Sequence, residues 1–222
     1  MENYLFPIAA VFVGYFFVLI LTPKQRTIKL LLAFSGAFLL SITIFHLLPD
    51  VYYQENSQHI GLFIMIGILL QIFLEFFSKG VEHGHVHIHK GQRNFPLIVF
   101  ISLCIHAVIE GAPINEHPTL LYGIIIHKIP IAIILSTFCL NLKMNTLHTS
   151  LLLILFAVMT PLGSLLANIQ GLKMYSGYLS ALVIGIFLHI ATTILFESSE
   201  GHKFNINKLA AILLGIITAY LL

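Results

Sequence analysis

The sequence predicts an all-α membrane protein that crosses the bilayer several times. Of its 222 residues, 58% are hydrophobic and only 9% are charged, and the mean hydropathy is +0.97. Soluble domains carry about 25% charged residues, so the composition excludes both an ordinary globular protein and an unfolded chain. The apolar residues gather in runs near the roughly 20 residues that one helix needs to cross a bilayer. The runs lack the alternation of a membrane barrel strand, which leaves helices.

Eight runs define the expected helices in order: 5–21, 29–48, 60–77, 95–115, 119–140, 147–168, 178–196 and 207–222. The last run is short, and adding Asn205 and Ile206 makes its length adequate. The acidic start Met1-Glu2-Asn3 and the lack of a small-residue cleavage site predict that the first run is a retained helix rather than a signal peptide. We therefore expect one transmembrane domain over 1–222, without a soluble module.

The distribution of lysine and arginine predicts the orientation of the helices. Only Lys173 lies on one side, and Lys128 falls inside an apolar run. The connections on the other side contain nine basic residues: Lys24, Arg26, Lys29, Lys79, Lys90, Arg93, Lys143, Lys203 and Lys208. The positive-inside rule places these nine in the cytoplasm and both termini outside. We expect the plasma membrane or a bacterial inner membrane, and the formal charge of +2 is too small to indicate a nucleic acid partner.

Ionisable side chains inside the apolar runs are candidates for a functional site, because charge at membrane depth is costly unless it is paired or solvated. His106 and Glu110 lie four residues apart, so a helix presents them on one face, about one turn apart. An imidazole nitrogen and a carboxylate oxygen so placed can both reach one divalent cation. The next run adds His127 and Lys128. A lone intramembrane histidine is more often a hydrogen-bonded packing residue, as we expect for His189, but this concentration favours metal binding.

Proline follows Glu110 and His127 at a distance of three residues. Pro113 and Pro130 each remove a backbone donor and block the carbonyl four residues back, which belongs to Ile109 or Ile126. Freed carbonyls beside charged side chains are further candidate oxygen ligands, as in the broken helices of transporters. The alternative is a simple kink.

Two further groups of candidate metal ligands lie outside the predicted centre. His46 and Asp50, at the outer end of the second run, can form a negative, imidazole-bearing entrance for a cation. A helix stop at Pro49 with exposed polar residues explains the same pattern nearly as well. The cytoplasmic loop 78–94 contains alternating histidines, and such a cluster binds zinc-like metals weakly and reversibly. These are His83, His85, His87 and His89.

In this order, the motifs resemble the ZIP (Zrt-, Irt-like) family of divalent metal transporters. The resemblance extends from the second run to the seventh. Each motif is short, but their order is specific, and the histidine-rich cytoplasmic loop agrees with it. The matching segments are His46-Leu47-Leu48-Pro49-Asp50, His106-Ala107-Val108-Ile109-Glu110-Gly111, His127-Lys128-Ile129-Pro130, Thr160-Pro161-Leu162-Gly163, and Phe187-Leu188-His189 to Phe196-Glu197.

The resemblance implies an eight-helix, ZIP-like bundle with a metal site at the bilayer centre, between the fourth and fifth helices. It also implies two inverted three-helix repeats, often as a homodimer, with one bundle sliding against another. The primary ligands carried over from the family are His106, Glu110 and His127.

The sequence departs from the family at the second metal position, where the residues are Ala107, Lys128 and Thr160. Ile131 replaces a further family ligand. We therefore expect one metal ion, with water or a backbone carbonyl completing its coordination. The ammonium of Lys128 is a candidate substitute for the charge of a second ion. The alternative is that Lys128 snorkels to the interface or is neutral.

The expected function is transport of Zn²⁺ toward the cytosol, without enzymatic activity or an organic cofactor. Two imidazoles and one carboxylate also suit Fe²⁺, Cd²⁺, Ni²⁺ or Co²⁺. The alternatives are a non-transporting or sensor-like relative, an efflux carrier, and an intramembrane metal-dependent hydrolase. A hydrolase needs an open coordination position and a separate general base. Glu110 cannot easily serve as both ligand and base, and Glu75 lies at the cytoplasmic end of the third run.

Overall fold

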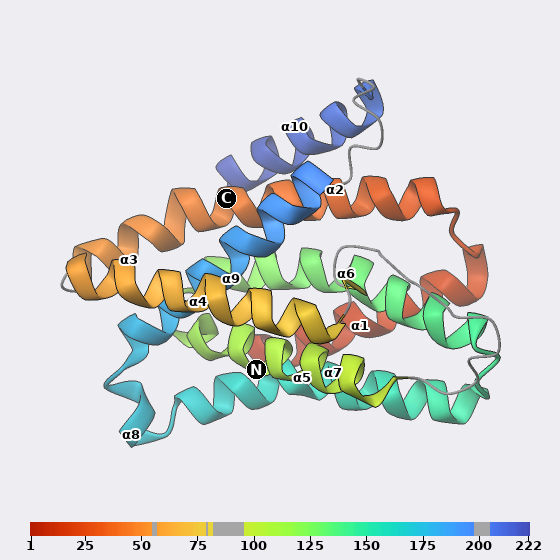
Figure 1. Ribbon diagram of the computed structural model, residues 1–222, viewed down its shortest axis with the longest axis horizontal. Helices are drawn as coiled ribbons and strands as arrows, with labels where there is room; N and C mark the ends of the chain where they lie inside the picture. The colour runs from red at the N-terminus through yellow and green to blue at the C-terminus, as the bar shows by residue number, and fades with distance from the viewer. Residues whose placement is uncertain (55–56, 79, 82–95, 198–204) are drawn as a thin grey trace.

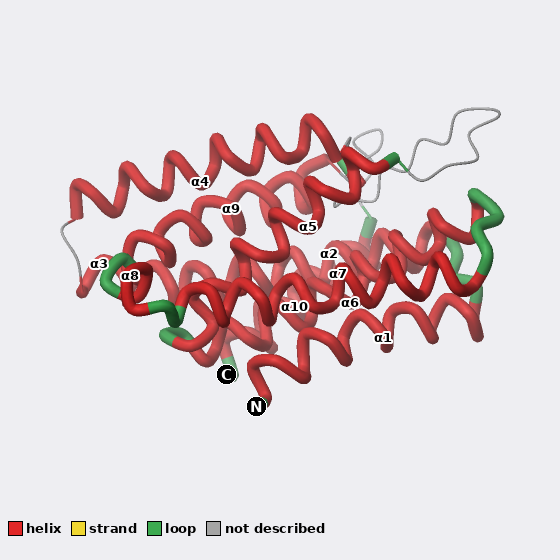
Figure 2. Tube along the Cα trace, turned by 90° about the horizontal axis from the view of Figure 1, so that it is seen from below, coloured by secondary structure: helices red, strands yellow, loops and turns green. Residues whose placement is uncertain are grey.

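The computed structural model describes residues 1–54, 57–78, 80–81, 96–197 and 205–222. These residues are almost entirely helical, and none of them forms a strand. Figure 1 shows an elongated bundle in which most helices run along the long axis, while α9 and α10 cross it obliquely. Figure 2 shows both chain ends along the same edge of the bundle. The prediction of an all-helical fold is confirmed for this part of the chain.

Seven helices in the described residues are long and apolar enough to cross a membrane. An additional apolar helix, α10 (Ile206–Tyr220), has 15 residues and is shorter than a straight span. A short helix that the sequence did not predict, α8 (Gln170–Lys173), joins two of the long ones. The long helices are α1 (Glu2–Leu21), α2 (Gln25–Ile42) with its extension, α4 (Ser57–Ser78), α5 (Leu97–Gly111), α6 (Pro118–Asn141), α7 (Thr146–Ala167) and α9 (Ser176–Glu197).

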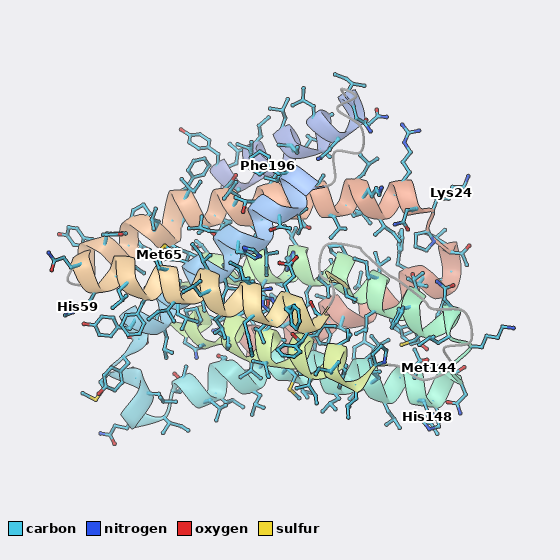
Figure 3. All side chains as sticks on the ribbon, viewed as in Figure 1. Lys24, His59, Met65, Met144, His148 and Phe196 are labelled. Carbon is cyan, nitrogen blue, oxygen red and sulfur yellow. The ribbon has the colours of Figure 1, made fainter. Side chains whose placement is uncertain are left out.

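The connections alternate between the two ends of the bundle, as expected for a chain that crosses a membrane repeatedly. The turns from α1 to α2 and from α6 to α7 lie at one end, and α3 (Leu48–Gln54) and α8 lie at the other (Figure 1). The side-chain view agrees, because Lys24, Met144 and His148 lie opposite His59 (Figure 3). A multi-pass membrane protein is therefore the supported class, whereas eight crossings stay a prediction.

Pro49 does not end the second helix, contrary to the predicted end of this run at residue 48. The helix continues through α3, so that Gln25–Tyr53 forms one apolar segment of 29 residues. A proline ring clashes with the carbonyl four residues earlier, here that of Phe45. The residues just before the proline, Thr43–Leu47, form a π-helix, whose wider turn accommodates the ring.

Pro113 does end α5, but the carbonyl that we expected to be freed is already in use. The backbone N–H of Ala112 donates to the carbonyl of Ile109. A 3₁₀-helix, Ala112–Asn115, then continues the chain. Because the tighter turn supplies a replacement donor, this carbonyl is not the open ligand that the sequence suggested. Pro130 lies inside α6, which continues to Asn141.

Two helix pairs approach so closely that only glycine fits between them. A Cβ added to Gly111 on α5 or Gly163 on α7 would lie 2.1 or 1.8 Å from a backbone oxygen of the other helix. The same arrangement joins α4 and α9, where a Cβ at Gly67 or Gly185 would lie 2.0 Å from a backbone oxygen. Small residues allow such close packing between membrane helices. The α5–α7 pair thereby places the ionisable face of α5 directly against α7.

Candidate functional site

Helices α5, α6 and α7 bring polar side chains together in the interior of the bundle. His106 and Glu110 come from α5, Lys128 from α6 and Thr160 from α7. Their exposed fractions are 5%, 2%, 2% and 0%. Because a buried charge is costly unless it is paired and hydrogen-bonded, the contacts among these groups determine what the site can do.

The carboxylate of Glu110 lies at the centre of the cluster. Lys128 Nζ donates a hydrogen bond to Glu110 Oε1 and forms a buried ion pair with it. The Thr160 hydroxyl lies 2.8 Å from the same oxygen. His106 Nε2 lies 3.4 Å from Oε2, as the four-residue spacing on α5 predicted. A divalent cation that binds Glu110 must therefore compete with an ammonium group that already neutralises it.

The ammonium of Lys128 is held from several sides. Besides Glu110, Nζ donates to Thr160 Oγ1 at 2.6 Å and lies 4.9 Å from the centre of the Phe156 ring. A cation over an aromatic face is stabilised by the ring quadrupole. The Thr160 hydroxyl can in turn donate to the carbonyl of Ala107, at 3.1 Å. The alternative in which Lys128 snorkels to the membrane surface is therefore wrong, because its side chain is bonded in the interior.

A glutamine on a fourth helix orients the imidazole of His106. Its Nδ1 lies 3.1 Å from Oε1 of Gln71, a fully buried residue of α4. When this amide oxygen accepts, Nδ1 carries the hydrogen, and the lone pair of Nε2 can then be offered to a metal ion bound beside Glu110. A neutral imidazole fixed in this way by an outer partner is the form that ligates metals. Sequence reasoning missed Gln71, although a glutamine inside an apolar run was a detectable signal.

A small cavity lies against this cluster. Its volume is about 10 Å³, close to the space for one water molecule. All three predicted ligands face it, but within the described ranges no three His, Cys, Asp or Glu side chains form a ready metal-binding group. The lining residues are Leu103, His106, Glu110, His127, Lys128, Ile131 and Phe156.

The predicted entrance residues lie near the opposite end of the molecule from Lys24. His46 is half-buried, and its Nε2 has no hydrogen-bond partner among the described residues. Asp50 is exposed, and its Oδ2 lies 3.5 Å from Nδ1 of His117, a buried residue just before α6. The sequence reasoning missed His117, because it lies between two apolar runs. The structure thus connects Asp50 with α6 rather than with His46.

His189 is hydrogen-bonded, as the packing interpretation predicted. Its Nε2 lies 2.6 Å from Oε2 of Glu75, so this pair bridges α9 and α4. Two ionisable groups in different apolar runs were a signal that they could be partners, but the sequence does not show which runs are adjacent.

The loop histidines His83, His85, His87 and His89 lie outside the described residues. No protein-family model matches the chain, and no curated protein matches it. The resemblance to the ZIP family therefore depends on the motifs themselves, and the site geometry is the independent observation on which a functional proposal can be built.

Proposed function

We propose that the protein is a ZIP-like transporter that carries one divalent metal ion at a time, most suitably Zn²⁺, toward the cytosol. The observation that carries the proposal is the shared cavity of His106, Glu110 and His127 within a bundle of apolar helices. Two imidazoles and a carboxylate, completed by water, provide the four ligands that Zn²⁺ prefers. Fe²⁺, Cd²⁺, Ni²⁺ and Co²⁺ are alternative cargoes for the same ligands.

The surroundings of Lys128 support a site for a single ion. An ammonium and a dication about 4 Å apart repel by roughly 8 kcal/mol at an effective dielectric constant of about 20. A second metal ion beside Lys128 is therefore strongly disfavoured. For the first ion to bind, the ammonium must move away from Glu110. Thr160 and Phe156 already contact Nζ, so they can retain the ammonium while the carboxylate turns to the metal.

Movement of the cargo requires the helices to rearrange, because the central side chains are almost completely buried. The glycine contacts make α5 with α7, and α4 with α9, two closely packed units. The hydrogen bond between His106 and Gln71 joins one unit to the other. Sliding of one unit past the other would break this bond and change the access to the cavity, in agreement with the bundle motion that the resemblance implies.

Metal uptake into proteoliposomes tests the proposal. His106→Ala and Glu110→Ala should abolish saturable zinc uptake, while the purified variants still contain helix and elute as the wild type does. His189→Gln is the matched control, because it alters an intramembrane histidine that does not line the cavity. Normal uptake and metal affinity in both cavity variants would place the transport site elsewhere.

A second candidate is a non-transporting relative, and the ion pair of Lys128 with Glu110 is the observation that favours it. In this case the ammonium is a permanent substitute for the metal. The same assay separates the two functions, because a non-transporting protein would show no uptake above that of empty vesicles, and His106→Ala would have no further effect.

A further inference from the structure

A second pocket lies far from the central cavity, at the end of the bundle where α1 turns into α2. It lies between the first turns of α2 and α10, and Figure 1 shows α10 slanting along one side of α2. Its volume is about 200 Å³, compared with about 10 Å³ for the central cavity. Its lining consists of Gln25, Arg26, Lys29, Leu30, Asn205 and Lys208.

The pocket is strongly basic. Arg26 and Lys29 are three residues apart on α2, so they lie on one face, and Lys208 comes from the first turn of α10. None of the described lining residues is acidic. Both helices also begin here, so the positive ends of two helix dipoles face the same space. The summed field favours an anion, and the planar guanidinium of Arg26 matches the oxygens of a phosphate.

The pocket is also anchored to a third helix, and the helices α1 and α10 carry exposed apolar residues. Lys208 Nζ donates to the carbonyl of Leu195 at 2.7 Å, which fixes its side chain between α10 and α9. Ile20 and Leu21, at the end of α1, are exposed, and so are Leu213 and Leu214 on α10. Exposed apolar residues on α1 and α10 provide surface suited to acyl chains. The positive-inside rule assigns this end to the cytoplasmic face, where anionic lipids attract lysine and arginine.

We propose that this pocket binds a phosphate group, presented either by an anionic phospholipid or by phosphate in solution. The phosphate oxygens accept hydrogen bonds from Arg26 and Lys29, while Lys208 adds a third positive charge. The amide side chain of Gln25 is a further donor. This site is independent of the proposed metal transport, because the two cavities share no residue.

Ligand titration of the purified full-length protein in a non-ionic detergent tests the site. Native mass spectrometry compares binding of phosphatidylglycerol with that of phosphatidylcholine, and a parallel titration uses inorganic phosphate. In Arg26→Gln/Lys29→Gln, binding of phosphatidylglycerol should weaken about 25-fold, because each basic residue near an anionic lipid contributes a factor of about five.

The matched control is Lys24→Gln/Lys143→Gln, which removes the same charge from the same end of the bundle without touching the pocket. It should leave the affinity nearly unchanged, and Arg26→Lys/Lys29→Arg should retain most of it. Selective loss of phosphatidylglycerol binding identifies the lipid as the source of the phosphate. Selective loss of binding to inorganic phosphate identifies the soluble anion. The proposal would be overturned if the pocket variant and the control variant changed the binding of both ligands equally. It would also be overturned if the protein bound no inorganic phosphate and did not prefer phosphatidylglycerol to phosphatidylcholine.

Discussion

Replacement of Lys128 by methionine tests whether its ammonium balances the buried charge of Glu110. Methionine retains an unbranched apolar stem but leaves a carboxylate that is 2% exposed without its opposite charge. Breaking a buried ion pair by removing one partner costs about 3–5 kcal/mol. We expect the free energy of unfolding of the metal-free variant to fall by about this amount. Denaturant titration in detergent, followed by the loss of helical circular dichroism, measures the change.

The double variant Glu110→Gln/Lys128→Met separates the charge from the packing. It removes both members of the pair, so no unpaired charge is left, and replacing a whole buried pair is often close to neutral. The double variant should therefore be more stable than Lys128→Met alone. If the single replacement were no more damaging than the double one, the ion pair would not be a significant source of stability.

Added Zn²⁺ extends the test to the proposed cargo. In Lys128→Met, a dication can replace the lost ammonium, and zinc at about 100 times its dissociation constant should restore roughly 2.7 kcal/mol. Wild type should gain less at the same concentration, because the metal must first displace the ammonium from Glu110. Lys208→Met, which alters a lysine outside the cavity, should respond to zinc as the wild type does. Equal stabilisation of wild type and Lys128→Met would refute the proposed competition.

Three further predictions concern topology, packing and stoichiometry. A cysteine at exposed Glu116 should react with an impermeant thiol reagent added outside cells, whereas a cysteine at exposed Lys24 should react only after permeabilisation; the reverse pattern would invert the orientation. Gly163→Ala should destabilise the protein by about 1–3 kcal/mol or more, because its Cβ would lie 1.8 Å from a backbone oxygen. Gly171→Ala, with open space around it, is the control and should be nearly neutral in the same unfolding assay. Lys128→Glu should raise the zinc content per protomer above one, measured by elemental analysis; unchanged content would argue that the ammonium does not exclude a second ion.

The helices could be predicted because a bilayer requires long apolar segments with internally bonded backbones. Local spacing also predicted the neighbourhood of His106 and Glu110, since residues four apart on a helix are adjacent. The partners contributed by other helices could not be found in this way. Gln71 and Phe156 reach the cluster only because α4 and α7 pack beside α5 and α6, and the sequence alone does not determine which helices are neighbours.

Prolines were the least predictable elements, because their effect depends on whether the neighbouring turn can change its pitch. The tighter 3₁₀ turn after Gly111 supplies a donor to the carbonyl that Pro113 would otherwise leave without one. The wider π-helix before Pro49 lets the second helix continue. In both cases the adjustment of the neighbouring turn decides the outcome, and the local sequence pattern does not show whether that turn tightens or widens.

The charge balance of the central cavity connects these contacts with the proposed transport. Glu110 and Lys128 together carry no net charge, and an imidazole that ligates a metal ion is neutral and adds none. A bound dication therefore leaves about two uncompensated positive charges in a region of low dielectric constant. Without Lys128, only one would be left, and binding would be tighter. The ammonium that Thr160 and Phe156 hold beside the cavity thus weakens metal binding through charge repulsion. Weak binding suits a carrier, which must release its cargo on the other side, better than it suits a site that stores metal.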